Sequence, residues 1–177
     1  MSYRDIATYA VLFPLLAVCA YTDARFGKVR NVVTVPGMVL GLLINAGFGG
    51  WAGGLSSLEG IGLAFGFFVV VSLLGRVMGA GDAKLLMAVG ALVGPVLLLW
   101  VIVYGALAGG VIAIGVALAK SRLKKELIGL VMSVAARLTG ATKLDYSKTD
   151  SLRIPYAVPL ALGAVVAIVL RGGVMPR

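Results

Sequence analysis

Long apolar segments separated by short polar stretches dominate the chain. The apolar runs occupy residues 6–21, 32–48, 61–77, 83–93, 95–119 and 155–170. A helix that crosses a bilayer needs about 20 predominantly apolar residues. The pattern therefore predicts about six transmembrane helices, with a loop over residues 49–60. The fourth helix is short, and the turn signal Gly94-Pro95 predicts a tight hairpin between it and the fifth.

Composition supports a bilayer as the solvent. Hydrophobic residues make up 60% of the chain and charged residues 13%, and the mean hydropathy is +1.05. A soluble domain of this composition would expose much of its apolar surface to water. The 25 glycines suit closely packed membrane helices, whose backbones approach where side chains are small. We expect an all-α, polytopic membrane helix bundle that forms a single domain over residues 1–177, without internal repeats.

The lysines and arginines predict the orientation. Basic residues crowd the loop after the first apolar run and flank the loop after the third, whereas residues 49–60 contain none. Of the 16 basic residues, all except Arg4, Arg171 and Arg177 fall on one side of the membrane in this arrangement. Basic loops are retained in the cytoplasm. Both termini are therefore predicted to lie outside, and the first apolar run, which lacks a cleavage signature, is expected to be retained.

The loop after the fifth apolar run has a helical pattern of its own. Apolar residues recur at helical spacing over residues 123–138, and basic residues fill much of the other face. This pattern predicts a cytoplasmic interfacial helix that rests on anionic lipid, or alternatively docks substrate. The net charge of +9 follows from basic residues at membrane edges, so no nucleic acid partner is predicted.

The residue types that are missing narrow the chemistry. The chain has no histidine and a single cysteine, Cys19. Ser-His-Asp catalysis, Cys-His catalysis, most zinc sites and a disulfide framework are thereby excluded. Acid and base chemistry falls to Asp, Glu, Lys or Tyr, and neither a metal nor a cofactor is predicted.

Two of the seven carboxylates are candidates for that chemistry. Asp23 follows the first apolar run and Asp82 precedes the fourth, so both are predicted at the cytoplasmic ends of their helices. Ionisable groups so close to hydrocarbon are costly and are functional candidates by default. Two adjacent carboxyl groups could share one proton and hydrolyse a peptide bond. Structural alternatives remain: Asp82 as a helix N-cap, and Asp23 in an ion pair with Arg25 or Lys28.

Two glycines precede Asp82. Gly79 and Gly81 would let the backbone take conformations closed to other residues and would admit an extended peptide close to Asp82. The alternative is that a Gly-x-Gly tripeptide is unremarkable in a chain so rich in glycine.

Three segments, in order, resemble one family. Residues 79–84, Gly-Ala-Gly-Asp-Ala-Lys, resemble the Gly-x-Gly-Asp-x-Lys signature of type IV prepilin peptidases. Residues 23–31 resemble that family's first catalytic stretch, an Asp followed by Ile-Pro-Asn, although Arg30 stands where Pro is usual. Residues 153–159 are similar to the Ile-Pro-Tyr sequence that opens the family's last helix.

The resemblance implies an aspartic endopeptidase of a prokaryotic inner membrane. Such an enzyme removes the basic leader of a prepilin or pseudopilin precursor at the cytoplasmic face, with Asp23 and Asp82 as the catalytic pair. The short stretch before the second helix lacks the Cys-rich insertion of larger, methylating members, so the resemblance implies a small form without methylation, as in members that serve tight-adherence pili. Lys84 is expected to be a basic membrane anchor, and Asn31 and Arg76 are candidates for contacting the leader.

Two other classes of function remain open. A transporter or proton relay also uses intramembrane carboxylates and Gly-broken helices. Such a protein should carry polar residues at helix centres, where this chain offers Asn45 and Ser72 as modest exceptions. A pilus assembly scaffold without catalytic activity would tolerate the loss of both aspartates, which a peptidase would not.

Overall fold

The described part of the chain is helical and contains no strand. A computed structural model describes residues 2–75, 79–119 and 156–171. Its helices are α1 (Tyr3–Phe26), α2 (Asn31–Gly75), α3 (Ala80–Ala119) and α5 (Ala157–Arg171). The predicted all-α bundle is confirmed for these residues. The predicted interfacial helix at residues 123–138 lies outside them.

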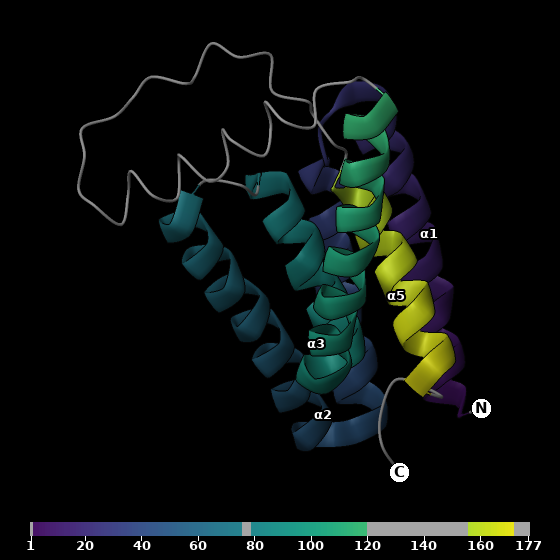
Figure 1. Ribbon diagram of the computed structural model, residues 1–177. Helices are drawn as coiled ribbons and strands as arrows, with labels where there is room; N and C mark the ends of the chain where they lie inside the picture. Colours follow the sequence, from purple (N-terminus) through teal and green to yellow (C-terminus); the bar gives the residue numbers. More distant parts are fainter. Residues whose placement is uncertain (1, 76–78, 120–155, 172–177) are drawn as a thin grey trace.

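The two longest helices fold back on themselves at single glycines. Gly50 in α2 has φ 57° and ψ −145°, and Gly94 in α3 has φ 76° and ψ 175°. Positive φ is open to glycine and costly for most other residues. Figure 1 shows both bends at the end of the bundle where α1 begins and α5 ends. Within the described residues, the bends divide the four helices into six helical segments.

The bends test two predictions about the turns. The turn predicted at Gly94-Pro95 is confirmed. The loop predicted over residues 49–60 is wrong, because Gly50 reverses the chain alone and the helix resumes at Trp51. A loop is predicted here because the stretch lies between two apolar runs, but a helix accommodates its Gly and Ser residues.

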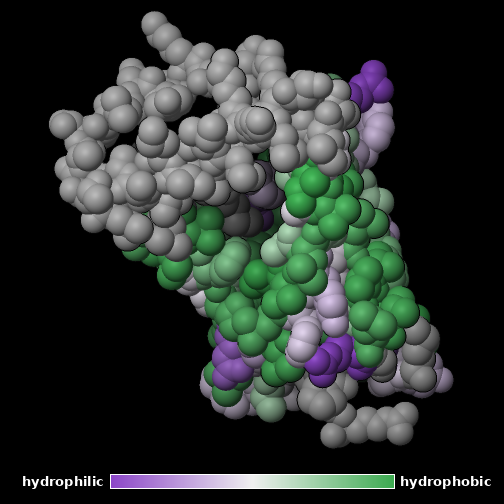
Figure 2. All heavy atoms as spheres, viewed as in Figure 1, coloured by the Kyte–Doolittle hydropathy of each residue, from purple (hydrophilic) through white to green (hydrophobic). Residues whose placement is uncertain are grey.

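The lateral surface of the bundle suits a lipid environment. In the part that the structure describes, α1, α2 and α3 are long and apolar enough to cross a membrane, and α5 is a shorter apolar helix. Figure 2 shows hydrophobic side chains over most of the visible lateral face, with strongly hydrophilic ones near the ends. Large exposed apolar residues such as Leu43, Leu107 and Val169 would be unfavourable in water. The number of membrane crossings stays a prediction.

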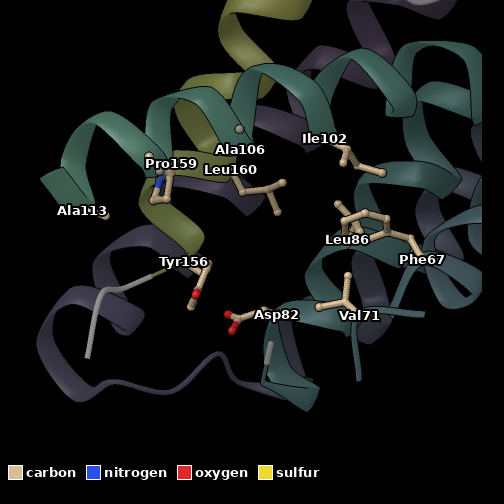
Figure 3. Close-up of a pocket in the computed structure, with 13 residues that line it drawn as sticks. Phe67, Val71, Asp82, Leu86, Ile102, Ala106, Ala113, Tyr156, Pro159 and Leu160 are labelled. Atoms are coloured by element: carbon tan, nitrogen blue, oxygen red, sulfur yellow. The ribbon is translucent and has the colours of Figure 1, made fainter. Parts of the chain in front are cut away.

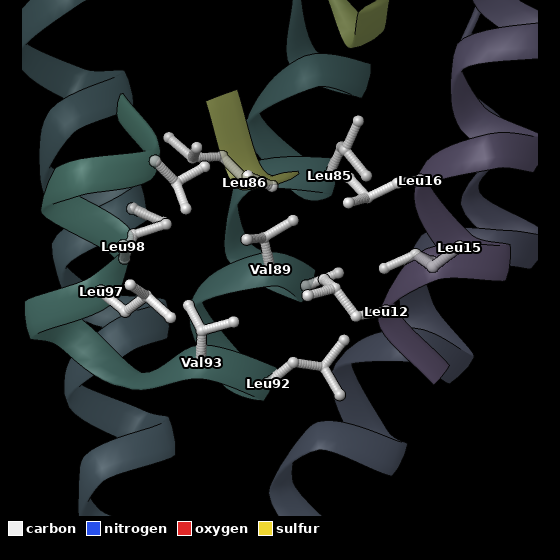
Figure 4. Packing of buried hydrophobic residues seen from close by; sticks show 14 of the residues in the cluster. Leu12, Leu15, Leu16, Leu85, Leu86, Val89, Leu92, Val93, Leu97 and Leu98 are labelled. Carbon is white, nitrogen blue, oxygen red and sulfur yellow. The ribbon is translucent and has the colours of Figure 1, made fainter. Parts of the chain in front are cut away.

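The first half of α3 is the centre of the core. Leu85, Leu86, Val89 and Leu92 are almost fully buried, and they face leucines of α1 and the second half of α3 (Figure 4). Protein surrounds this segment on several sides, so it can be short without exposing its ends to lipid.

Buried polar groups join the helices beside the two bends. The Arg4 guanidinium donates to Asn45 Oδ1 at 2.6 and 3.0 Å. Asn45 Nδ2 donates to the Ala91 carbonyl at 2.7 Å, and Ser57 Oγ donates to the same carbonyl at 2.6 Å. In an uninterrupted helix that carbonyl would bond the N–H four residues later, but the residue there is Pro95, which has none. Asn45 and Ser57 therefore replace a hydrogen bond that the bend removes.

The second half of α2 meets α3 at a pair of glycines. A Cβ on Gly60 would overlap the Gly90 carbonyl, and a Cβ on Gly90 would lie 2.5 Å from the Gly60 carbonyl oxygen. The two backbones are therefore in direct contact at this crossing. In Figure 1, the second half of α2 diverges from α3 beyond it, toward the end away from the bends.

Candidate active site

Asp23 lies in the last turn of α1, with its carboxylate directed at α5. The side chain is buried, with 8% exposed, and Oδ2 accepts the backbone N–H of Ala157 at 2.9 Å. Ala157 is the first residue of α5. Asp23 thus satisfies one of the N–H groups that a helix leaves unpaired at its start, and it joins the end of α1 to the start of α5.

The interfacial ion pair considered for Asp23 finds no support in these contacts. Arg25 donates instead to the Tyr21 hydroxyl at 2.8 Å, and its guanidinium lies over the rings of Tyr21 and Phe26. Because Arg25 is exposed at the surface and Asp23 is buried, the two neighbours serve different environments.

Asp82 lies in the first turn of α3. Helix α3 begins at Ala80, so Asp82 is its third residue rather than its N-cap. Its Oδ2 accepts the N–H of Gly79 at 3.3 Å, which stabilises the start of the helix. The capping alternative is therefore correct in part, because this carboxylate bonds the helix start while it also faces a cleft.

The fold brings the two aspartates to one end of the bundle. Asp23 bonds Ala157, and the preceding residue, Tyr156, lines the same cleft as Asp82. The prediction that they share an end of the bundle is confirmed by this arrangement; their catalytic role stays a prediction.

The two glycines before Asp82 contribute by leaving room for neighbouring groups, and not by adopting unusual backbone torsions. Among the described glycines, positive φ occurs at Gly27, Gly50 and Gly94, so the conformational role predicted for Gly79 and Gly81 is wrong. A Cβ on Gly79 would lie 3.1 Å from Asp82 Oδ2, and one on Gly81 would lie 3.2 Å from the Val29 Cβ. The absence of side chains leaves room for the carboxylate and for the loop that follows α1.

An apolar cleft of about 350 Å³ opens beside Asp82. Figure 3 shows Asp82 and Tyr156 at one end of it, with their side chains pointing toward one another. Among the described residues that line the cleft, these two carry the only polar side chains. The walls come from the second half of α2, from both halves of α3 and from the start of α5: Phe67, Val71, Leu86, Ile102, Gly105, Ala106, Gly109, Gly110, Ala113, Pro159 and Leu160.

Tyr156 is the residue of this site to which sequence reasoning assigned no role. Its side chain is 41% exposed at the cleft. A phenol has an ordinary pKa of about 10, so the Tyr156 hydroxyl is a protonated hydrogen-bond donor at neutral pH. The signal available in the sequence was its place at the start of the last apolar run.

The lesser candidates divide into two groups. Lys84 Nζ donates to Asn31 Oδ1 at 3.1 Å, which links the start of α2 to the first turns of α3 on the exposed surface. The structure thus brings together two residues that the sequence could only name separately. Arg76 lies outside the described residues.

The arrangement can support acid and base chemistry on a peptide. Two carboxyl groups at one end of a bundle, beside an apolar cleft, can share a proton and activate water. The sequence matches the model of a family described as the type IV leader peptidase family over residues 10–114, a stretch that contains both aspartates. No curated protein and no solved structure matches the chain significantly.

Proposed function

This chain belongs to the type IV leader peptidase family, and from that premise we propose that it is an aspartic endopeptidase of prepilin-like proteins. It removes a basic leader at the cytoplasmic face of the membrane, with Asp23 and Asp82 as the catalytic pair. The observation that carries the proposal is that Asp23, bonded to the start of α5, and Asp82, which lines an apolar cleft together with Tyr156, lie at one end of the bundle.

The pair would hydrolyse the peptide bond through a tetrahedral intermediate. The ionised carboxylate takes a proton from water as the water oxygen bonds to the scissile carbonyl carbon, and the protonated carboxyl gives its proton to the carbonyl oxygen. The C–N bond then breaks, the carbonyl re-forms with loss of that proton to a carboxylate, and the amine leaves with a proton. One water is consumed, and the pair returns to its singly protonated state.

The cleft suits a substrate that is polar on one side of the cut and apolar on the other. A prepilin-like precursor carries a basic leader in water and an apolar helix in the membrane. The apolar walls of the cleft accept the start of that helix, while the leader stays at the polar end of the bundle. Backbone at the cut has to be extended, because a helical peptide hides its carbonyls from attack.

The proposed topology uses the six helical segments as six crossings. The bends at Gly50 and Gly94 then lie on the outer side with both termini, and the aspartates lie on the cytoplasmic side of a prokaryotic inner membrane. The distribution of lysine and arginine supports this orientation. At the outer end, the Arg171 guanidinium lies 3.6 Å from the centre of the Trp100 ring, a pairing suited to a membrane interface.

Leader removal from a purified prepilin in proteoliposomes tests the proposal. The wild-type chain should cleave, and Asp23→Asn and Asp82→Asn should each abolish cleavage while they accumulate normally. Asp5→Asn is the matched control, because Asp5 also accepts a backbone N–H at a helix start, that of Ser2 at 3.0 Å. If both active-end variants still cleave, the aspartates are structural, and a scaffold or a transporter becomes the better interpretation.

A further inference from the structure

The start of α5 is held in place beside the two aspartates. Asp23 Oδ2 accepts the Ala157 N–H at 2.9 Å, and the Tyr156 carbonyl accepts the N–H of Leu160 at 3.2 Å. Both bonds fix the peptide unit between Tyr156 and Ala157, directly after the Tyr156 side chain. Pro159, in the same turn, is buried and has a restricted φ. Tyr156 therefore directly precedes a fixed peptide unit at the start of α5, which restricts where its side chain can lie.

The phenol of Tyr156 faces the place where a substrate peptide would lie. It points toward Asp82 at the mouth of the cleft (Figure 3). Its partial exposure leaves the hydroxyl reachable by a peptide. Asp82 and Tyr156 line the same cleft, and a phenol keeps its proton at neutral pH.

Peptide hydrolysis by two carboxyl groups gains from a further hydrogen-bond donor at the carbonyl oxygen. The carbonyl oxygen gains negative charge as water adds to the carbon, and a fixed hydrogen-bond donor aimed at that oxygen lowers the barrier. One carboxyl group supplies a proton while the other is occupied with the water. Among the described residues that line the cleft, the remaining polar side chain is Tyr156, and its O–H is a donor.

We propose that Tyr156 is a third catalytic residue, whose hydroxyl donates a hydrogen bond to the scissile carbonyl oxygen and holds it in the tetrahedral intermediate. The inference rests on the proposed peptidase function and deepens it. The phenol keeps its own proton throughout, so the proton balance of the carboxyl pair is unchanged.

Tyr156→Phe removes the hydroxyl and keeps the ring that packs at the cleft. Loss of one such donor should lower kcat about 10- to 100-fold, with KM changed less than about threefold, because the bond strengthens in the transition state. Steady-state cleavage of a prepilin by purified enzyme in proteoliposomes gives both constants. Tyr104→Phe is the matched control, since Tyr104 stacks on Trp100 away from the cleft and should keep wild-type kinetics.

A structural role for the hydroxyl would show in different quantities. If Tyr156→Phe keeps wild-type kcat, or raises KM alone, the proposed role is wrong and the ring merely packs. Thermal unfolding is measured on the same samples, and an equal loss of kcat and of folded enzyme also overturns the proposal. If the variant is unstable, single-turnover cleavage rates normalised to the folded fraction still separate a slower reaction from a loss of folded enzyme.

The peptidase function and the role of Tyr156 fail in separate ways. If the wild type does not cleave, or if Asp23→Asn and Asp82→Asn still cleave, the function itself is wrong. If the wild type cleaves, both Asn variants are inactive and Tyr156→Phe is as fast as the wild type, the function stands and the role of Tyr156 alone is rejected.

Discussion

The two ends of the bundle use polar side chains in opposite ways. At the end with the bends, which we call the closed end, Arg4, Asn45 and Ser57 bond one another and the Ala91 carbonyl. At the other end, which we call the open end, Asp82 and Tyr156 face an apolar cleft. Buried polar groups stabilise a fold when the protein supplies their partners. They are available for chemistry when part of their surroundings is left for a substrate.

The same local device occurs at both ends, which makes the comparison testable. Asp5 is the third residue of α1 and accepts the Ser2 N–H, and Asp82 is the third residue of α3 and accepts the Gly79 N–H. Both carboxylates stabilise a helix start. At the open end alone, the same carboxylate also meets a second aspartate and a cleft.

The largest effect should come from moving one carboxylate at the open end. Asp82→Glu keeps the charge but shifts the carboxylate by one methylene, and a misplacement of about 1 Å can cost roughly 100-fold in rate. Asp5→Glu makes the same change at the closed end and should leave kcat within about twofold, since no catalytic geometry depends on it. Prepilin cleavage rates of the two variants, per folded enzyme, give the comparison; equal losses would contradict it.

A somewhat smaller effect, on stability instead of rate, is expected at the closed end. Asn45→Ala removes the side-chain donor to the Leu92 carbonyl and one of the two side-chain donors to the Ala91 carbonyl, and an unsatisfied buried group costs about 1–3 kcal/mol. Thermal unfolding in detergent should show the loss, while kcat of the folded fraction stays at the wild-type value. Asn31→Ala, which removes only the exposed bond from Lys84, is the control and should lose less stability than Asn45→Ala. A fall in kcat without a loss of stability would mean that the closed end contributes directly to the reaction at the open end, which contradicts the comparison.

Filling the cleft should weaken substrate binding and leave the chemical step intact. A Cβ on Gly109 would touch the Pro159 ring at ordinary contact distance, and the rest of a leucine would occupy the cleft. Gly109→Leu should raise KM about tenfold, which is about 1.4 kcal/mol of binding, with kcat little changed. Gly115→Leu is the control, because nothing lies within 4 Å of its added Cβ and it does not line the cleft. An unchanged KM in Gly109→Leu would mean that the substrate binds elsewhere.

The smallest effect should follow removal of the exposed bond between α2 and α3. Lys84→Ala deletes the donor to Asn31, and exposed pairs of this kind contribute roughly 0.2–1 kcal/mol. Cleavage should change less than about threefold, and Lys84→Ala combined with Asn31→Ala should be no worse than either variant alone. A large loss of kcat in Lys84→Ala would assign this lysine a part in the reaction.

Much of the arrangement was predictable from the chain, because hydropathy and charge act over short stretches. The apolar runs predicted the helical segments, Gly94-Pro95 predicted a turn, and the basic loops placed Asp23 and Asp82 at one end. The bond from Asp23 to Ala157 was not predictable, since it joins residues far apart in sequence through packing of α1 on α5. No pattern in the sequence indicated that Gly50 alone would reverse the chain without a loop.

Asn45 and Tyr156 show why the remaining features escaped prediction. A lone asparagine in an apolar run is equally compatible with a conducting path and with a structural bond, and its partners Arg4 and Ala91 decide between them. Tyr156 gains its interest from a cleft built by three helices, and a cleft has no local pattern in the sequence.

The contact between Gly60 and Gly90 gives the cleft a mechanical property. The second half of α2 contacts α3 backbone to backbone at Gly60 and Gly90, and this crossing lies between the bends and the cleft. Phe67 and Val71 lie beyond this crossing, on the part of α2 that lines the cleft. The gap they bound is therefore governed by the crossing angle as much as by the side chains that line it. A bulkier residue at Gly60 or Gly90 should change the crossing angle and thereby widen or narrow the cleft, without touching any residue that lines it.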